Sequence, residues 1–155
     1  IQELSDFLRG TIRKDDQQLV SLEEEIRHLN LYLEIEKVRF GHRLKTEISV
    51  DDNSKKIQLP VLLLQPLLEN AIKFGLYDTI GEITISLKAI NSNGNLHVSI
   101  ENPFDPETSQ ARPGTGFGLT SIQRRLYLLY GRNDLLSASN NESIFITELK
   151  IPQPA

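Results

Sequence analysis

The residues best suited to chemistry lie in a short polar run beside a hydrophobic segment. Glu69, Asn70 and Lys73 follow the almost entirely apolar stretch 61–68. A buried charge or amide without a partner costs several kcal/mol, so these groups must either pair inside the protein or bind a ligand. An Asn oxygen suits a hard cation such as Mg²⁺, and a Lys ammonium offers a point charge to phosphate. The run is therefore a candidate magnesium–phosphate site, with internal pairing as the alternative.

A glycine-rich run, Gly114-Thr115-Gly116-Phe117-Gly118-Leu119, is the second candidate. Glycines let backbone N–H groups approach an anion, and the start of the helix that follows favours negative charge. The run lacks the Lys-Ser/Thr ending of a Walker A loop, and no βαβ unit around it indicates a dinucleotide fold. A flexible hinge is the alternative interpretation.

The apolar spacing predicts the helices that position these runs. Residues 1–14 carry a helical stripe that faces either the core or a partner helix in a dimer. A second helix begins at Ser21, which forms a capping box with Glu24, and ends at Gly41. The acidic residues 23–25 suit a solvated helix start better than a metal site. Pro60 is expected to open an apolar helix over 61–72 that closes at Gly75.

The remaining segments predict a sheet and one more helix. Alternation indicates strands over 46–50, 83–87, 96–100 and 144–151, with a hairpin turn at 91–95. A long polar loop covers 102–116, and a helix follows over 119–130 with Gly131 as its stop. This order predicts an α+β fold, a two-layer α/β sandwich with helices on one face of a mixed or antiparallel sheet.

Composition sets limits on the function. The chain has 155 residues, enough for one domain with a core, and a net charge of −4, which argues against a nucleic-acid binder. It has no Cys, which excludes disulfides and thiolate chemistry. The apolar stretch 59–64 is far shorter than the roughly 20 residues of a membrane span. The absence of Met indicates a processed chain or a piece of a larger protein.

The two candidate runs, separated by a strand pair and a loop, resemble a known family. Their order is similar to that in the Bergerat-fold ATP-binding domain of histidine kinases, gyrase, Hsp90 and MutL, and the closer resemblance is to LytS-like sensor histidine kinases. Residues 64–73 resemble the N box of these kinases, and 114–126 resemble their second glycine box. Residues 21–40 resemble the helix that opens the catalytic domain. Residues 1–20 then correspond to the end of a dimerisation and phosphotransfer helix with its linker, and 21–155 to the catalytic and ATP-binding domain.

This resemblance implies a role for each site residue, with ATP and Mg²⁺ as cofactors. Asn70 would ligate magnesium, Glu69 would orient or activate the attacking group, and Lys73 would face the phosphates. The loop 102–116 would be the ATP lid, and Asn102 would stand where the family places the Asp that binds adenine. Further nucleotide-binding residues would be Gly114, Thr115, Gly116, Phe117, Gly118 and Leu119.

The resemblance also implies a reaction and partners. The ATP γ-phosphoryl group would pass to a His upstream of Leu4 and then to a response regulator. The full-length protein would be a homodimer, and this part would be a cytoplasmic domain of an inner-membrane protein anchored through further N-terminal segments. The chain's own His28, His42 and His97 lack the context of the family's acceptor His.

Three departures from the family pattern favour a second hypothesis. Phe74 stands where relatives often carry His, and Asn102-Pro103 begins the segment where an Asp-x-Gly-x-Gly box is expected. Residues 141–143 lack the Gly-Thr that precedes the last strand. The alternative is therefore a pseudokinase, a signalling scaffold with weak or no nucleotide turnover. An ATPase of the Hsp90 or MutL type is a third hypothesis, which the LytS-like opening helix disfavours.

Strand alternation makes a prediction about Asn102. Leu96, Val98 and Ile100 share one face of their strand, so Asn102 continues that face and Glu101 points away. A carboxylate at this position only accepts hydrogen bonds, whereas an amide can flip and donate. We therefore expect weaker ATP binding than in relatives, and weaker discrimination against GTP.

Overall fold

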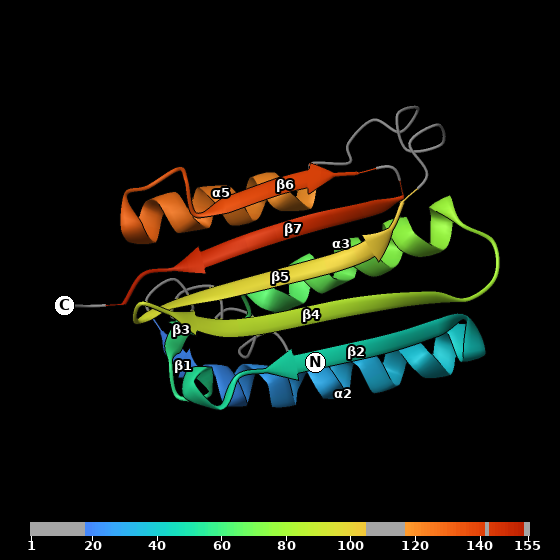
Figure 1. Ribbon diagram of the computed structural model, residues 1–155, viewed down its shortest axis with the longest axis horizontal. Helices are drawn as coiled ribbons and strands as arrows, with labels where there is room; N and C mark the ends of the chain where they lie inside the picture. The colour runs from blue at the N-terminus through green and yellow to red at the C-terminus, as the bar shows by residue number, and fades with distance from the viewer. Residues whose placement is uncertain (1–17, 105–116, 142, 154–155) are drawn as a thin grey trace, which may run out of the picture.

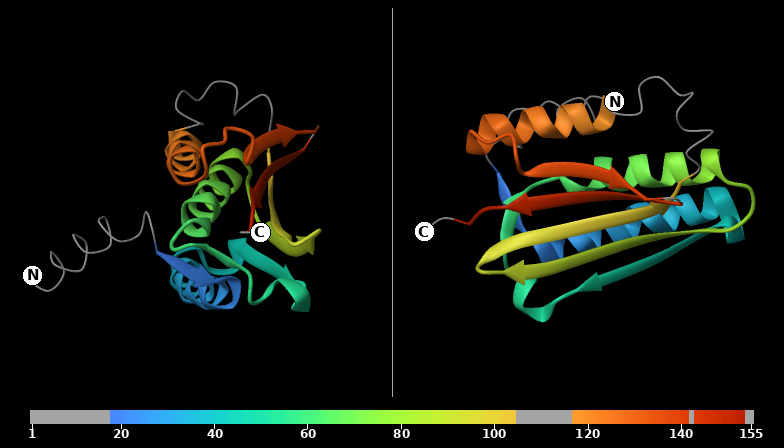
Figure 2. Two further views of the ribbon diagram at one scale, coloured as in Figure 1. Left: turned by 90° about the vertical axis from the view of Figure 1, so that its left-hand side faces the viewer. Right: turned by 45° about the horizontal axis from the view of Figure 1, so that its top comes forward.

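The computed structural model describes residues 18–104, 117–141 and 143–153, which form two layers (Figure 1). One layer is a five-stranded sheet and the other is made of helices (Figure 2, left). The elements are β1 Leu19–Ser21, α2 Leu22–Phe40, β2 Leu44–Val50, β3 Gln58–Pro60, α3 Leu64–Asp78, β4 Ile83–Ser92, β5 Asn95–Pro103, α5 Phe117–Tyr130, β6 Leu136–Asn140 and β7 Ile144–Ile151, with short 3₁₀ turns at Gly41–Arg43 and Asp52–Ser54.

The sheet is mixed, as expected. Its strand order is β2-β4-β5-β7-β6, and β1 and β3 form a separate two-stranded sheet. Strand β2 runs parallel to β4, whereas the other neighbours in the large sheet are antiparallel. The α+β sandwich with helices on one face is therefore confirmed. The predicted helix at 1–14 lies outside the described residues.

Apolar residues that alternate along the strands meet the apolar faces of the helices. Leu22, Leu29 and Leu33 of α2 are buried, as are most apolar residues of α3. From the sheet, Ile83, Ile85, Leu87 and Ala89 of β4 and Leu96, Val98 and Ile100 of β5 complete one continuous core. Among the described residues, no helix is long and apolar enough to cross a membrane.

Most predicted element ends are confirmed by local contacts. The Glu24 N–H donates to Ser21 Oγ at 3.2 Å, as a capping box requires. Gly131 ends α5 in a left-handed conformation, and its N–H donates to the Tyr127 carbonyl. The hairpin between β4 and β5 turns at Asn93 and Gly94, which both have positive φ, the signature of a type I′ turn.

The predicted limits of the third helix were wrong at both ends. Pro60 closes β3 instead of opening a helix, and Leu62 takes a positive φ of 57° before α3 begins at Leu64. Gly75 lies inside α3, not at its end. A Cβ atom at position 75 would lie 2.8 Å from Ile83 Cδ1, so glycine is needed where α3 approaches β4 closely.

Side chains from two other helices hold the start of α3. The residue before α3, Leu63, supplies no side-chain cap. Instead Glu25 of α2, only 2% exposed, accepts a hydrogen bond from the Leu62 N–H at 3.1 Å. Arg125 of α5 donates to the carbonyls of Val61 at 2.6 Å and Leu62 at 3.4 Å. Helices α2 and α5 therefore fix the turn from which α3 starts.

Burial raises the pKa of the Glu25 carboxyl above its ordinary value of 4.5, against smaller lowering effects of the Leu62 N–H, His28 and Arg125. The folded chain thus binds this proton more tightly than the unfolded chain does. The stability that Glu25 contributes is full below pH 4.5 and is lost as pH rises through the folded-state pKa.

We expect Glu25→Gln to remove this loss, because Gln cannot ionise yet keeps an oxygen that accepts from Leu62. The free energy of unfolding of the variant, relative to the parent, should rise as pH increases from 4.5 through the raised folded-state pKa of Glu25, in urea titrations. Glu25→Ala, which also removes the acceptor, should cost about 1–3 kcal/mol. Glu23→Gln, exposed on the same helix, is the control. A difference between Glu25→Gln and parent that stays constant with pH would contradict the assignment.

Candidate functional site

Three segments of the candidate site lie at one end of the molecule. The C-terminal end of β5, the C-terminal half of α3 and the start of α5 share this end (Figure 1). A Cβ atom at Gly75 of α3 would lie 3.7 Å from Pro103 Cδ at the end of β5. Asn70 lies five residues earlier on α3, about 7.5 Å along the helix axis. The two candidate runs and Asn102 are thus neighbours in space although 48 positions separate Gly118 from Asn70.

Asn102 ends the buried face of β5, as the alternation predicts. It is 3% exposed, whereas Glu101 is exposed on the other face of the sheet. Its Nδ2 donates to the Pro103 carbonyl at 2.8 Å. This bond fixes the orientation of the amide, because a flip would place Oδ1 against another oxygen. Oδ1 is therefore the acceptor that Asn102 can offer to a ligand, beside the second N–H of its amide.

Asn70 is the polar side chain of the N-box-like run that points toward the interior. The residue is half-buried, and its Nδ2 is fully buried without a hydrogen-bond partner among the described residues. An amide nitrogen in this state lacks an acceptor, which a bound water would supply. Its oxygen is of the ligand type that Mg²⁺ prefers. Since no cluster of acidic or His ligands is found in the described ranges, phosphate oxygens and water would have to complete the coordination.

Glu69 and Lys73 lie on a different face of α3 from Asn70. Both are exposed, so the expectation that this run is buried holds only for Asn70. They line a groove of about 370 Å³ between α2 and α3, together with Tyr32, Glu36, Arg39 and apolar residues. Lys73 Nζ lies 5.9 Å from the centroid of the Phe74 ring.

Tyr32 shows the electrostatic character of this groove. Burial raises the pKa of its phenol well above the ordinary range, and the carboxylates of Glu36 and Glu69 add to the rise. Arg39 opposes it weakly. The groove therefore combines a phenol held in its neutral form with two acidic and two basic side chains.

The glycine-rich run is described only in its second half. Gly114, Thr115 and Gly116 lie outside the described residues, as does most of the predicted lid. Phe117 is the first residue of α5, Gly118 lies in its first turn, and half-buried Leu119 packs against the core. The prediction that this run leads directly into a helix is confirmed.

Two departures from the family pattern have local substitutes. The Asn141 side chain accepts hydrogen bonds from the N–H groups of Ser143 and Ile144, which stabilises the connection from β6 to β7 without the Gly-Thr pair. Phe104, just after Pro103, packs against Phe145 of β7 with ring centroids 5.8 Å apart. The Phe104 N–H also donates to the Ser143 carbonyl at 2.8 Å. The end of β5 is thus anchored on β7 at the position where the family resemblance implies a glycine box.

The histidines occupy three unrelated environments. His28 of α2 contacts Gln65 of α3, with Nε2 and Oε1 2.6 Å apart. His42 is exposed after α2, and His97 is half-buried on the face of the sheet that points away from the helices. His42 precedes Arg43, which donates to the Leu76 and Thr79 carbonyls at the C-terminal end of α3, whereas His28 lies beside the start of α3.

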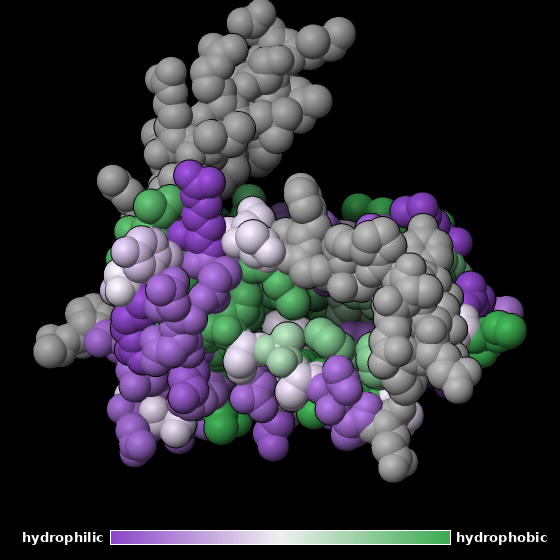
Figure 3. All heavy atoms as spheres, turned by 90° about the horizontal axis from the view of Figure 1, so that it is seen from above, coloured by the Kyte–Doolittle hydropathy of each residue, from purple (hydrophilic) through white to green (hydrophobic). Residues whose placement is uncertain are grey.

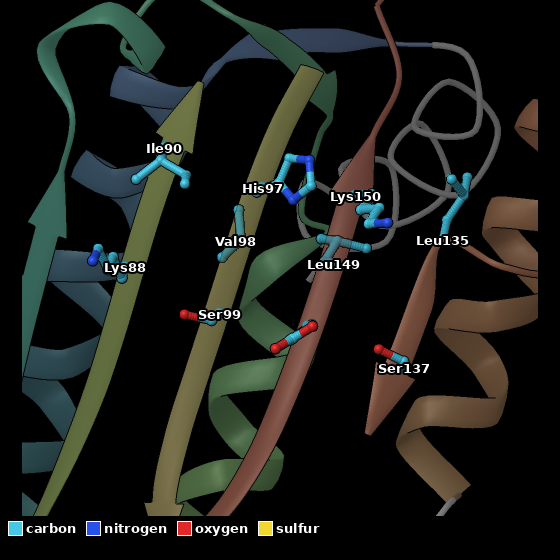
Figure 4. A pocket seen from close by; sticks show the side chains of 10 residues that line it. Lys88, Ile90, His97, Val98, Ser99, Leu135, Ser137, Leu149 and Lys150 are labelled. Atoms are coloured by element: carbon cyan, nitrogen blue, oxygen red, sulfur yellow. The ribbon is translucent and has the colours of Figure 1, made fainter. Parts of the chain in front are cut away.

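Two other surfaces contain none of the predicted site residues. A shallow pocket of about 270 Å³ lies over the sheet face that bears Lys88, His97 and Lys150 (Figure 4). Its lining mixes these groups with Glu148 and aliphatic side chains, and nothing in it selects one ligand. Viewed from the side of α5, apolar side chains are exposed between hydrophilic ones (Figure 3); Leu128 of α5 is 70% exposed.

Comparisons with known proteins agree with this arrangement. A family model described as histidine kinase matches residues 1–44. Sensor protein LytS of Oceanobacillus iheyensis is 31% identical over 164 residues, which cover 97% of this chain and 28% of the relative. Sensor histidine kinase BtsS of Escherichia coli strain K12 is 33% identical over 134 residues, covering 84% of this chain and 23% of the relative.

The fold is shared with solved histidine kinase structures. The catalytic domain of histidine kinase ThkA superposes with a TM-score of 0.61 at 18% identity, covering 86% of this chain and 97% of that domain. The chain spans about a quarter of the length of the curated relatives it matches. The family model, the relatives and the shared fold together place this chain in the family of LytS-like sensor histidine kinases.

Proposed function

We propose that this chain is the ATP-binding catalytic domain of a two-component sensor histidine kinase. The observation that carries the proposal is the pair of interior-facing amides, Asn70 on α3 and Asn102 on β5, at the end of the sheet where α5 starts. Asn102 is buried and oriented, and Asn70 has a buried N–H group without a partner among the described residues. The two amide oxygens suit the two ends of Mg²⁺-ATP: Asn102 Oδ1 the adenine amino group and the Asn70 oxygen the metal ion.

Adenine recognition is assigned to Asn102. Because Nδ2 is engaged by the Pro103 carbonyl, Oδ1 can accept from the adenine amino group and disfavours the guanine carbonyl. The sequence led us to expect weaker discrimination against GTP, because the Asn102 amide could flip and donate to guanine. The hydrogen bond to Pro103 opposes this flip, so we propose that the chain prefers ATP. The neutral amide still replaces a carboxylate, which should cost on the order of 1 kcal/mol, or several-fold in affinity.

Phosphate binding is assigned to Asn70, Lys73 and the first turn of α5. The Asn70 oxygen would hold Mg²⁺, which when bound neutralises charge on the phosphates. Lys73, one turn further along α3, adds a positive charge, and the N–H groups at the start of α5 favour an anion. These groups would hold the phosphates in place and stabilise their negative charge, which is what this chain would contribute to phosphoryl transfer. Glu69 would orient or activate the attacking group.

The phosphoryl acceptor is proposed to be a His upstream of Leu4, since His28, His42 and His97 lack the sequence context of the family's acceptor. In the whole protein, the phosphoryl group would pass on to a response regulator, and the kinase would act as a homodimer. Residues 1–20 would form the end of the dimerisation helix with its linker, and the domain would lie on the cytoplasmic side of a membrane.

One observation favours the alternative of a pseudokinase scaffold. Strand β5 continues through Asn102 to Pro103, and Phe104 is anchored on β7, where active relatives carry a flexible glycine box. A rigid segment there would restrict closure over a nucleotide. Weak or absent binding of Mg²⁺-ATP by this chain in calorimetry would favour this alternative.

Calorimetry with ATP and MgCl₂ tests the phosphate assignment. We expect the parent chain to bind ATP with an affinity that rises on adding Mg²⁺, and Asn70→Ala to lose this magnesium dependence together with most of the affinity. Asn30→Ala, exposed on α2, is the matched control and should bind like the parent. Magnesium-dependent binding that persists in Asn70→Ala would show that the metal is held elsewhere.

A second titration compares ATP with GTP. The parent should prefer ATP, and Asn102→Asp should bind ATP several-fold more tightly, because a charged acceptor makes the stronger hydrogen bond. Asn140→Asp, exposed on β6, should change neither affinity. Equal binding of ATP and GTP by the parent would mean that the Asn102 amide flips or does not contact the base.

A further inference from the structure

A chain of hydrogen bonds connects α2 to the exposed face of α3, and two of its three residues, His28 and Gln65, have no role in the function proposed above. His28 Nε2 lies 2.6 Å from Gln65 Oε1, and Gln65 Nε2 donates to Glu69 Oε1 at 2.9 Å. Gln65 and Glu69 are one helical turn apart, and His28 reaches them from the neighbouring helix. The end of this chain is a carboxylate that lines the same groove as Lys73.

The chemistry of the three groups gives the chain one direction. A carboxylate only accepts hydrogen bonds, so the Gln65 amide must turn its N–H toward Glu69 and its oxygen toward His28. His28 must then donate, which requires a proton on Nε2. The ionised Glu69 thus sets the amide orientation of Gln65, and Gln65 sets the proton position on His28.

Glu69 does not form the ion pair that its position favours. A Glu four residues before a Lys on a helix surface is the preferred order for an ion pair, and Lys73 stands four residues after Glu69. No ion pair joins them in the described part of the chain, where the salt bridges are Lys45–Glu82, Lys55–Asp52 and Arg132–Asp134. Gln65, on the preceding turn, holds the carboxylate instead.

We propose that Gln65 and His28 are positioning residues that hold Glu69 away from Lys73 and so keep the Lys73 ammonium available for a nucleotide phosphate. The inference rests on the proposed function for the role of Lys73. Gln65 acts directly on the carboxylate, and His28 acts through Gln65 by satisfying its oxygen. Without this chain, Glu69 would pair with Lys73, and ATP would have to displace the carboxylate before binding.

The test is a set of affinities for Mg²⁺-ATP measured by calorimetry. Gln65→Leu should weaken binding by about 1.5- to 2-fold, the effect expected from one ion pair on a helix surface. Adding Glu69→Gln to Gln65→Leu should restore the affinity, because the neutral amide no longer competes for Lys73. Gln58→Leu, exposed on β3, is the matched control. A Gln65→Leu chain that binds like the parent, or a double variant that is not restored, overturns the proposal.

His28 is tested by conservative rescue and by its nuclear magnetic resonance signals. His28→Leu should weaken binding in the same direction as Gln65→Leu, and His28→Gln, which keeps a donor, should not. The imidazole ¹⁵N shifts of the parent should report a proton on Nε2, and Gln65→Leu should change them, whereas Gln58→Leu should not. Unchanged shifts in Gln65→Leu overturn the chain of contacts itself. If the parent binds no ATP, the proposed function fails, while these shifts still decide whether the chain of contacts exists.

Discussion

The candidate site depends on where and at what angle α3 leaves the turn at residues 61–63. This turn contains a leucine with positive φ and backbone groups that no residue of α3 itself satisfies. A buried carboxylate from α2 accepts from its N–H group, and a guanidinium from α5 donates to its carbonyls. Burying Glu25 and holding Leu62 at positive φ both cost energy. The hydrogen bonds that join α2, α3 and α5 at this turn offset that cost. Because α5 follows directly from the glycine-rich run, this point connects both halves of the candidate site.

Fixing α3 divides its polar residues between two surfaces. The apolar face packs against β4 and β5, which turns the Asn70 amide toward the interior and leaves Glu69 and Lys73 beside α2. The interior surface provides oriented amides, and the outer groove provides charges whose pairing the Gln65 contact controls. One helix can thereby supply both a metal ligand and a cation to the same nucleotide without the cation being neutralised by its neighbour.

Local rules in the sequence predicted much of the fold, and the failures have physical causes. Ser21 with Glu24, the Asn93-Gly94 turn and the strand 144–151 are determined by residues close in sequence. Pro60 was misread because proline suits both a helix start and a short edge strand. Gly75 was misread because its role is to allow a close contact between α3 and Ile83 of β4.

Strands β1, β3 and β6 were missed because they are short or exposed and lack alternation. Asn70 and Asn102 were recognised from their sequence context. The exposure of Glu69 and the contact of His28 with Gln65 depend on how α2 and α3 pack, so no local rule predicts them. The four-residue spacing of Gln65 and Glu69 was the one local sign that these two side chains could meet.

The most direct test of the account is a titration of the ¹⁵N-labelled chain with Mg²⁺-ATP, followed by backbone and side-chain amide resonances. The account predicts that the largest shifts occur at the Asn70 and Asn102 side-chain amides and at the backbone N–H groups of 117–119, with little change at Lys88, His97 and Lys150. Shifts confined to the open face of the sheet, or shifts at Asn102 without any at Asn70, would contradict it.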